Sequence, residues 1–150
     1  MLFRSTLEIF QYLKDENPNI QLKMHTNGSA RTTEWWRGVA RMKVRTTFGI
    51  DGMSDTHHLY RQNTSYNTVI KNAKTFIQSG GQATWKMIEF KHNKHQIDQC
   101  CTLSKELGFA HFSLLNQGRD TAPVFNQKGQ LTHVLGDYTG EKEFKILFFS

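Results

Sequence analysis

Two short apolar runs in this sequence each end in a polar residue followed by a glycine, and a segment with helical spacing separates them. The runs are Lys23–Gly28 (KMHTNG) and Thr46–Gly52 (TTFGIDG). A parallel α/β sheet binds ligands at the carboxyl ends of its strands, where a polar side chain can face the ligand and glycine lets the backbone approach closely. The pattern therefore predicts an α/β fold with Asn27 and Asp51 as candidate site residues.

The apolar periodicity alternates between helical and strand-like spacing along most of the chain. Helices are expected over residues 5–16, from Thr32 or Thr33 through Met42, from Ser65 to Gly80-Gly81, and over 96–107. Strands are expected over 20–26, 44–50, 83–90 and 109–115. This alternation predicts a parallel sheet with right-handed crossovers. Beyond Asn116 the pattern fails, and apolar Phe144–Phe149 is expected either as a late strand or as a sticky sheet edge.

Length and composition suit one domain with a core, since the chain has 150 residues of which 37% are hydrophobic. No apolar run is long enough to cross a bilayer, and Met1–Arg4 gives way too soon to polar residues for a secretory signal. We therefore expect a cytoplasmic protein without membrane partners. The net charge of +6 suits an anionic partner. The basic residues never form a long run, however, which favours a solvated surface over a nucleic-acid interface.

The only two cysteines, Cys100 and Cys101, are adjacent within a helical pattern. Neighbouring helical residues point about 100° apart, so these two do not bridge easily and are expected to be reduced and structural. Without a CxxC or a longer-spaced set of thiols, this chain alone cannot hold an iron–sulfur cluster or a structural zinc through cysteine. No metal site is predicted.

The order of several short motifs resembles the second half of the core of radical S-adenosylmethionine (radical SAM) enzymes. The resemblance covers about residues 5–120 and rests on Thr26-Asn27-Gly28-Ser29, Gly49-Ile50-Asp51-Gly52, Thr56–Thr64, Gly80-Gly81, Trp85–Asn93 and Leu107-Gly108-Phe109. It implies a partial (β/α)6 barrel of the TIM-barrel type that contains strand ends three to six. Residues 1–118 would form this part of the core, and 119–150 an irregular tail with room for one late strand.

The resemblance also implies the cofactors SAM and a [4Fe–4S] cluster. In that family a CxxxCxxC loop holds the cluster and a Gly-Gly-Glu-type motif helps to hold SAM, and neither motif occurs here. We expect this chain to be a fragment that supplies the adenosine and substrate wall of the barrel. Its partner would be a separate N-terminal half that carries the cluster, and alone the chain would be inactive.

The resemblance carries five residues over as cofactor-binding candidates. Asn27 matches the third strand end, Asp51 and Arg61 match the fourth strand end and its loop, and His92 and Asn93 match the fifth. Many relatives place a ribose-binding serine where this chain has Gly49. The catalytic residues and the substrate are not indicated by the sequence.

Each candidate also has a structural interpretation. Asn27 could only form a turn, and Asp51 could form an Asx turn before Gly52. Arg61 could pair with Asp55 instead of a ligand. His92 and His95, at i and i+3, have ligand types that suit zinc, whereas the Trp35-Trp36 pair favours core packing. The alternative function is a small basic α/β module that binds a nucleotide or nucleic acid without redox chemistry.

Overall fold

The protein is seen here in a computed structural model, which describes residues 5–116, 122–135 and 144–148. The helices are α1 (Thr6–Glu16), α2 (Thr33–Arg41), α3 (His57–Tyr60), α4 (Tyr66–Gln78) and α5 (Ile97–Glu106), with a 3₁₀ turn η1 at Lys94–Gln96. The strands are β1 (Lys23–Thr26), β2 (Arg45–Gly49), β3 (Ala83–Glu89), β4 (His111–Asn116), β5 (Ala122–Phe125), β6 (Leu131–Leu135) and β7 (Phe144–Phe148).

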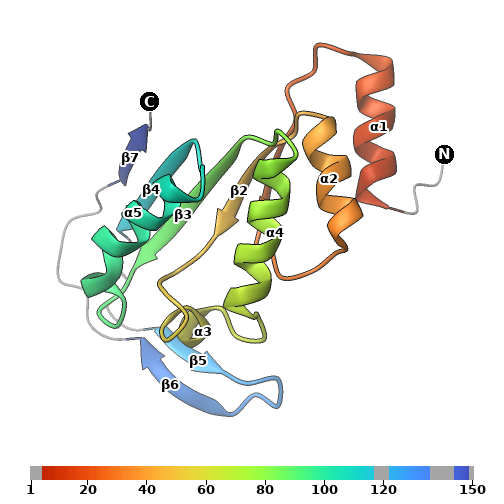
Figure 1. Ribbon diagram of the computed structural model, residues 1–150. Coiled ribbons are helices and arrows are strands. Elements are labelled where there is room, and N and C mark those ends of the chain that lie inside the picture. Colours follow the sequence, from red (N-terminus) through yellow and green to blue (C-terminus); the bar gives the residue numbers. More distant parts are fainter. Residues whose placement is uncertain (1–4, 117–121, 136–143, 149–150) are drawn as a thin grey trace.

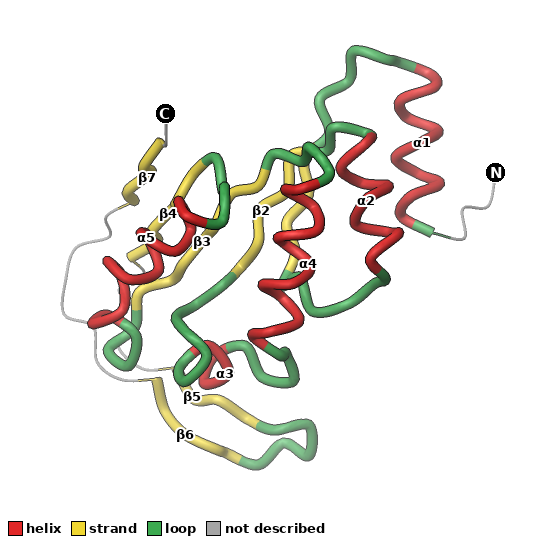
Figure 2. The backbone as a smooth tube through the Cα atoms, viewed as in Figure 1, coloured by secondary structure: helices red, strands yellow, loops and turns green. Residues whose placement is uncertain are grey.

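One five-stranded sheet, in the order β1-β2-β3-β4-β7, forms the centre of the molecule. The first four strands are parallel and alternate with helices along the chain, so the predicted α/β fold is confirmed. Strand β7 pairs with β4 in the antiparallel direction, and β5 with β6 forms a separate hairpin. In Figures 1 and 2, α2, α4 and α5 lie in front of the sheet and the hairpin lies below α3. The boundary expected at residue 118 stays a prediction.

The helices begin and end where the sequence carries capping residues. The Ser5, Thr32 and Ser65 hydroxyls each accept the N–H of the residue three positions later, at the starts of α1, α2 and α4. After α4, Gly80 takes a φ of +86°, which glycine adopts without strain, and the Gly81 N–H donates to the Phe76 carbonyl. The described helices do not combine the length and apolar character needed to span a membrane.

The core lies between the sheet and its helices. Trp36 of α2 is 1% exposed, and its ring lies 5.2 Å from that of Phe48 in β2 and 6.4 Å from that of Phe76 in α4. Trp35 meets Trp36 edge-on at 4.8 Å. Packing as the role of this tryptophan pair is therefore confirmed, because Trp36 is enclosed in the aromatic centre of the core.

The two faces of the sheet differ sharply because successive strand residues point to opposite sides. Phe48, Trp85 and Phe112 face the helices and belong to the main core. We call the opposite side the inner face. By this alternation, it carries Lys23, His25, Arg45, Thr47, Gly49, Thr84, Lys86, Ile88, His111, Ser113 and Leu115.

Candidate functional site

A buried ion pair stands at the carboxyl end of β2. The Asp51 side chain is 0% exposed; its Oδ2 accepts from Arg61 Nε at 2.6 Å, and its Oδ1 accepts from the Ile88 N–H of β3 at 2.6 Å. Burial raises the pKa of Asp51, and the Arg61 guanidinium and the Ile88 N–H offset part of that rise. The Asx-turn interpretation of Asp51 is wrong, because its carboxylate ties the β2 end to β3 instead.

Arg61 is held in place by Asp51, and pairing with Asp55 is therefore wrong as well. Asp55 instead accepts from Gln96 Nε2 at 2.9 Å. The Arg61 guanidinium lies 5.1 Å from the Tyr60 ring centre, and its side chain is 27% exposed. Its Nε is engaged by Asp51, and its two outer nitrogens have no hydrogen bond to the described residues.

Gly49 leaves the room that Arg61 occupies. A Cβ at position 49 would come 2.6 Å from Arg61 Nη2, which is closer than real Cβ contacts allow. The position expected to match a ribose-binding serine therefore carries no side chain, and a guanidinium lies over it instead. The position of the Arg61 guanidinium at this strand end therefore depends on the missing side chain at Gly49.

His57 also holds this strand end, through a hydrogen bond with the Asp51 backbone. Its Nδ1 accepts from the Asp51 N–H at 3.2 Å, so the proton lies on Nε2, which donates to Thr64 Oγ1 at 3.0 Å. The Thr64 hydroxyl in turn donates to the Arg61 carbonyl at 2.6 Å. Burial lowers the pKa of His57 to about 4, so the ring is neutral at pH 7.

Asn93 joins the ends of β2 and β3. It is 0% exposed; its Nδ2 donates to the Ile88 carbonyl at 2.9 Å and to the Asp51 carbonyl at 3.3 Å, and its Oδ1 accepts from the Phe90 N–H at 2.8 Å. Its polar atoms are therefore all engaged by backbone. This geometry suits a positioning residue, and cofactor contact by Asn93 stays a prediction.

His92 differs from Asn93 because it has an unused polar atom. Its Nε2 is buried and has no hydrogen-bond partner among the described residues. The ring stacks on Phe90, with the centroids 5.4 Å apart and the planes 12° from parallel. Burial lowers the pKa of His92, so the neutral ring can donate or accept a hydrogen bond.

Asn27 lies at the end of β1, apart from the Asp51–Arg61 pair, and is exposed. Its Oδ1 accepts from the Ser29 N–H at 3.1 Å and from the Ser29 hydroxyl at 2.9 Å. The turn interpretation of Asn27 is thus confirmed, while a ligand contact stays a prediction. Behind the turn, Asn72 of α4 donates from Nδ2 to the Gly28 carbonyl at 2.8 Å.

The sequence did not single out Gln96 or Asn72, although both hold the loops at the strand ends. Gln96 Oε1 accepts from the Met53 N–H at 3.0 Å and from the Thr56 hydroxyl. For Asn72, the available signal was a polar side chain among the apolar positions Val69, Ala73 and Phe76 of α4. For Gln96 there was no signal, because its partners are distant in the sequence.

A small apolar cluster lies beside this site, on the inner face. Ile88 and Phe90 pack with Tyr60, Leu115 and Val124 of the β5–β6 hairpin. The hairpin is also tied to α3 and to the loop after it. His133 Nε2 donates to the Leu59 carbonyl of α3 at 2.6 Å, and Gln62 Nε2 of the loop donates to Thr132 Oγ1 at 3.1 Å. The hairpin therefore borders the strand ends on the side of α3.

Metal binding by the described residues finds no support in the geometry. His92 lies in a turn ahead of η1, so it does not share a helical face with His95 as the zinc interpretation required. In the described ranges there is no cluster of three histidine, cysteine or acidic side chains able to hold a metal ion. Cys100 is buried, which raises the pKa of its thiol to about 12 and disfavours the thiolate that a metal needs.

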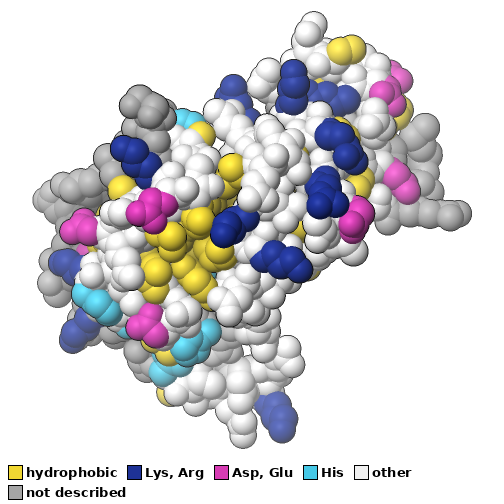
Figure 3. Space-filling view, viewed as in Figure 1, with side chains coloured by type: hydrophobic (Ala, Val, Ile, Leu, Met, Phe, Trp, Pro, Cys, Tyr) yellow, Lys and Arg dark blue, Asp and Glu magenta, His cyan; other side chains and the backbone are white. Residues whose placement is uncertain are grey.

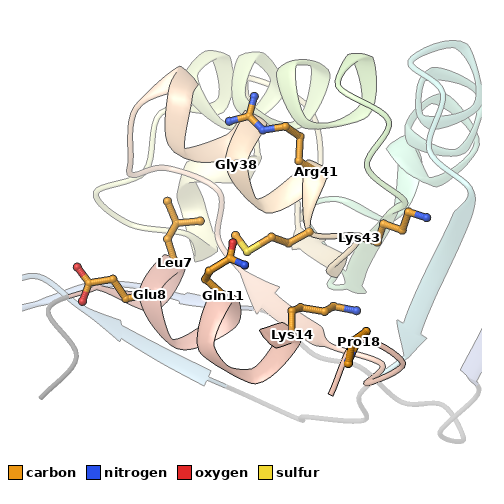
Figure 4. Close-up of a pocket in the computed structure, with 9 residues that line it drawn as sticks. Leu7, Glu8, Gln11, Lys14, Pro18, Gly38, Arg41 and Lys43 are labelled. Atoms are coloured by element: carbon orange, nitrogen blue, oxygen red, sulfur yellow. The ribbon is translucent and has the colours of Figure 1, made fainter. Parts of the chain in front are cut away.

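A separate groove of about 680 Å³ lies between α1 and α2, away from all five candidate residues. Figure 4 shows its labelled side chains: Leu7, Glu8, Gln11 and Lys14 come from α1, and Gly38, Arg41 and Lys43 come from α2 and the turn after it. The carboxyl ends of the strands carry the more specific arrangement of polar groups, and they are the candidate site.

Solved structures provide the useful comparison, since no family model and no curated protein sequence match this chain. SuiB from Streptococcus suis, bound to S-adenosylmethionine, matches with a TM-score of 0.64 and 16% identity, over 75% of this chain and 26% of SuiB. The enzyme anSMEcpe with bound AdoMet matches with a TM-score of 0.62 and 17% identity, over 81% of this chain and 36% of that one.

A third match is TsrM from Kitasatospora setae, a radical SAM methyltransferase with cobalamin and a [4Fe-4S] cluster bound. Its TM-score is 0.54 and its identity 12%, over 73% of this chain and 24% of TsrM. This chain thus spans between 24% and 36% of the lengths of these three proteins. At such low identities the likeness is one of fold. The fold of this chain is similar to part of the radical SAM barrel, as the order of its motifs predicts.

Proposed function

We propose that this chain forms the part of a radical SAM core that faces the adenosine of SAM and the substrate, with the [4Fe–4S] cluster held by another polypeptide segment. The observation that carries this proposal is the match of three quarters or more of the chain to two structures that contain bound SAM. SAM, in enzymes of this kind, supplies the radical that starts the reaction. A cytoplasmic location belongs to the same proposal, because free cysteines suit a reducing compartment.

Two side chains at the strand ends support this proposal for SAM. Arg61 offers two outer nitrogens, which suit a carboxylate or ribose hydroxyls, and His92 offers a buried Nε2 that suits a polar atom of the nucleoside. Asp51 and Asn93 fix the positions of these groups, since their own polar atoms are already bonded. Asn27 lies at the next strand end and would approach the ligand through its exposed turn.

The cluster does not fit the cysteines of this chain. Cys100 and Cys101 are neighbours on α5, and three thiolates at CxxxCxxC spacing are needed. We therefore assign the cluster to a separate N-terminal half as partner. Its docking position would be the outer edge of β1, which has no neighbour among the described strands. The Arg45 N–H donates to the Leu22 carbonyl, so the backbone groups of Lys23 and His25 point away from β2 toward this edge.

The first test is to determine the coding sequence immediately upstream of Met1 in the source DNA. A CxxxCxxC motif encoded there, in frame or nearly so, would support the proposal. A complete and isolated gene with no such motif nearby would favour the alternative of a basic nucleotide-binding module.

The second test is ligand binding. With the cluster-bearing polypeptide present, calorimetry with S-adenosylhomocysteine should show binding that Arg61→Met weakens by about tenfold, the effect of losing a charge-assisted hydrogen bond. Arg41→Met in the α1–α2 groove is the matched control and should bind as the wild type does. Equal affinity in both variants would contradict the role of Arg61.

A further inference from the structure

The inner face of the sheet is arranged in rows by the strand register. Lys23 of β1 is level with Arg45 of β2, and Gly49 of β2 is level with Lys86 of β3. Ser113 of β4 continues the second row beside Lys86. The Arg61 guanidinium lies over Gly49. This row therefore carries the Arg61 guanidinium, the Lys86 ammonium and the Ser113 hydroxyl, in that order across the sheet.

The charges on this face are all of one sign. Three of its residues are lysine or arginine, and none of its residues on β1 to β4 is acidic. Lys86 is half-buried and makes no hydrogen bond or ion pair with any described residue. The nearest acidic group, Asp51, is already paired with Arg61. Lys86 is therefore a partly desolvated cation whose nearby carboxylate, Asp51, is shared with Arg61.

The inner face carries a second group of positive charges, formed by Lys23 of β1 and Arg45 of β2. Like charges directly opposite each other on neighbouring strands destabilise a sheet. Both side chains are exposed, and neither pairs with a carboxylate among the described residues. This row lies four residues below the row of Lys86, which is roughly 13 Å along the strand.

We propose that the inner face binds an anionic substrate, a small molecule with a carboxylate or phosphate group, which is held at Lys86 and Ser113 and attracted by Lys23 and Arg45. The inference rests on the proposed function, because it assigns the substrate side of the same barrel. An anion there would give Lys86 a counter-charge that it does not share with Arg61. Figure 3 shows the opposite, helix-bearing face, where basic side chains lie over α4, α2 and α1 with acidic ones among them.

The test titrates the full 150-residue chain with two probes, inorganic phosphate and succinate, and monitors binding by two-dimensional NMR. Both probes should shift the amide signals of Lys86 and Ser113, and the probe that binds more tightly identifies the anionic group. Lys86→Met should weaken this binding by at least about tenfold. Lys74→Met, on the exposed side of α4, is the matched control and should leave it unchanged, and Lys86→Gln replaces Lys86→Met if the latter does not fold.

The inference would be overturned if the inner face showed no shifts, or if the Lys86 and Lys74 variants bound the probe with the same affinity. Displacement of the probe by S-adenosylhomocysteine would overturn it as well, because the anion site would then belong to the cofactor. Tighter, Lys86-dependent binding of a single-stranded oligonucleotide would also overturn it in favour of nucleic acid. Failure of the proposed function would look different from failure of this inference, because SAM would then not bind while phosphate would still bind at Lys86.

Discussion

At the scale of single residues, the arrangement depends on Asp51, a buried carboxylate with two different tasks. One oxygen holds the β3 backbone and the other fixes the Nε of Arg61. Because Asp51 engages only this nitrogen, the outer nitrogens of Arg61 remain available beside Gly49. The orientation of Arg61 is thus fixed by its bond to buried Asp51 and does not require a ligand.

Replacing Asp51 with asparagine should lower the free energy of unfolding by about 3 kcal/mol, because it breaks a buried ion pair and leaves Arg61 without its partner. Urea denaturation measures this change. Asp55→Asn is the control: Asp55 is exposed, and its replacement should change stability by no more than about 0.5 kcal/mol. Equal losses in the two variants would contradict the structural role of Asp51.

His57 makes stability dependent on pH. Its pKa is about 4 in the folded protein, below the ordinary value of 6.5, so the unfolded chain takes up the proton first as the pH falls. The stabilising contribution is complete above pH 6.5 and is lost between pH 6.5 and 4, by about 3 kcal/mol in total. In His57→Gln, the melting temperature should therefore change less between pH 6.5 and 4 than it does in the wild type.

His58 provides the control for this pH dependence. It is exposed and adjacent in sequence, so His58→Gln should keep the wild-type pH dependence. A wild-type slope retained in His57→Gln would show that another group controls stability in this range.

At the scale of elements, the strand-end loops are fixed by side chains that reach across the fold. Asn72 of α4 holds the loop between β1 and α2, and Gln96 holds the loop after β2. The loops that border the candidate site are thus held in place by hydrogen bonds from Asn72 and Gln96.

Replacing Asn72 with alanine should cost about 2 kcal/mol of unfolding free energy, since it leaves the buried Gly28 carbonyl without its donor. The amides of residues 28–30 should also exchange faster with deuterium, because the loop loses its anchor. Asn67→Ala, on the exposed side of the same helix, should change neither quantity. Unchanged exchange in Asn72→Ala would show that the turn at Asn27 holds the loop by itself.

The elements could be predicted from sequence because local signals mark them. Ser5, Ser65 and Gly80-Gly81 lie at helix ends, and apolar spacing distinguishes helices from strands. The site was only partly predictable. A pair between Arg61 and Asp55 was one of two interpretations, since the two residues are near in sequence. The packing of β2 against β3 buries Asp51, and Arg61 pairs with Asp51 instead. The contacts of Gln96 needed the tertiary fold.

At the scale of the whole molecule, the sheet has two different edges. Strand β7 covers the outer side of β4, whereas β1 has no neighbour on its far side among the described strands. An exposed strand edge of this kind is ready to pair with another strand. We propose that the cluster-bearing half docks at this edge.

Proline at position 25 tests that placement. The His25 N–H points away from β2, so His25→Pro should leave the chain folded and weaken its association with the cluster-bearing polypeptide by about tenfold, the effect of one lost backbone hydrogen bond. His25→Ala keeps the N–H and should associate normally. Equal affinities of the two variants, measured by calorimetry, would place the partner elsewhere.

Whether this chain belongs to a radical SAM core is tested most directly by the formation of 5′-deoxyadenosine from SAM under anaerobic, reducing conditions. The cluster-bearing polypeptide should form the product only when this chain is present, and Arg61→Met should reduce the yield while Arg41→Met does not. Product formed equally well without this chain, or none from the complex with an intact cluster, would contradict the assignment of this chain to a radical SAM core.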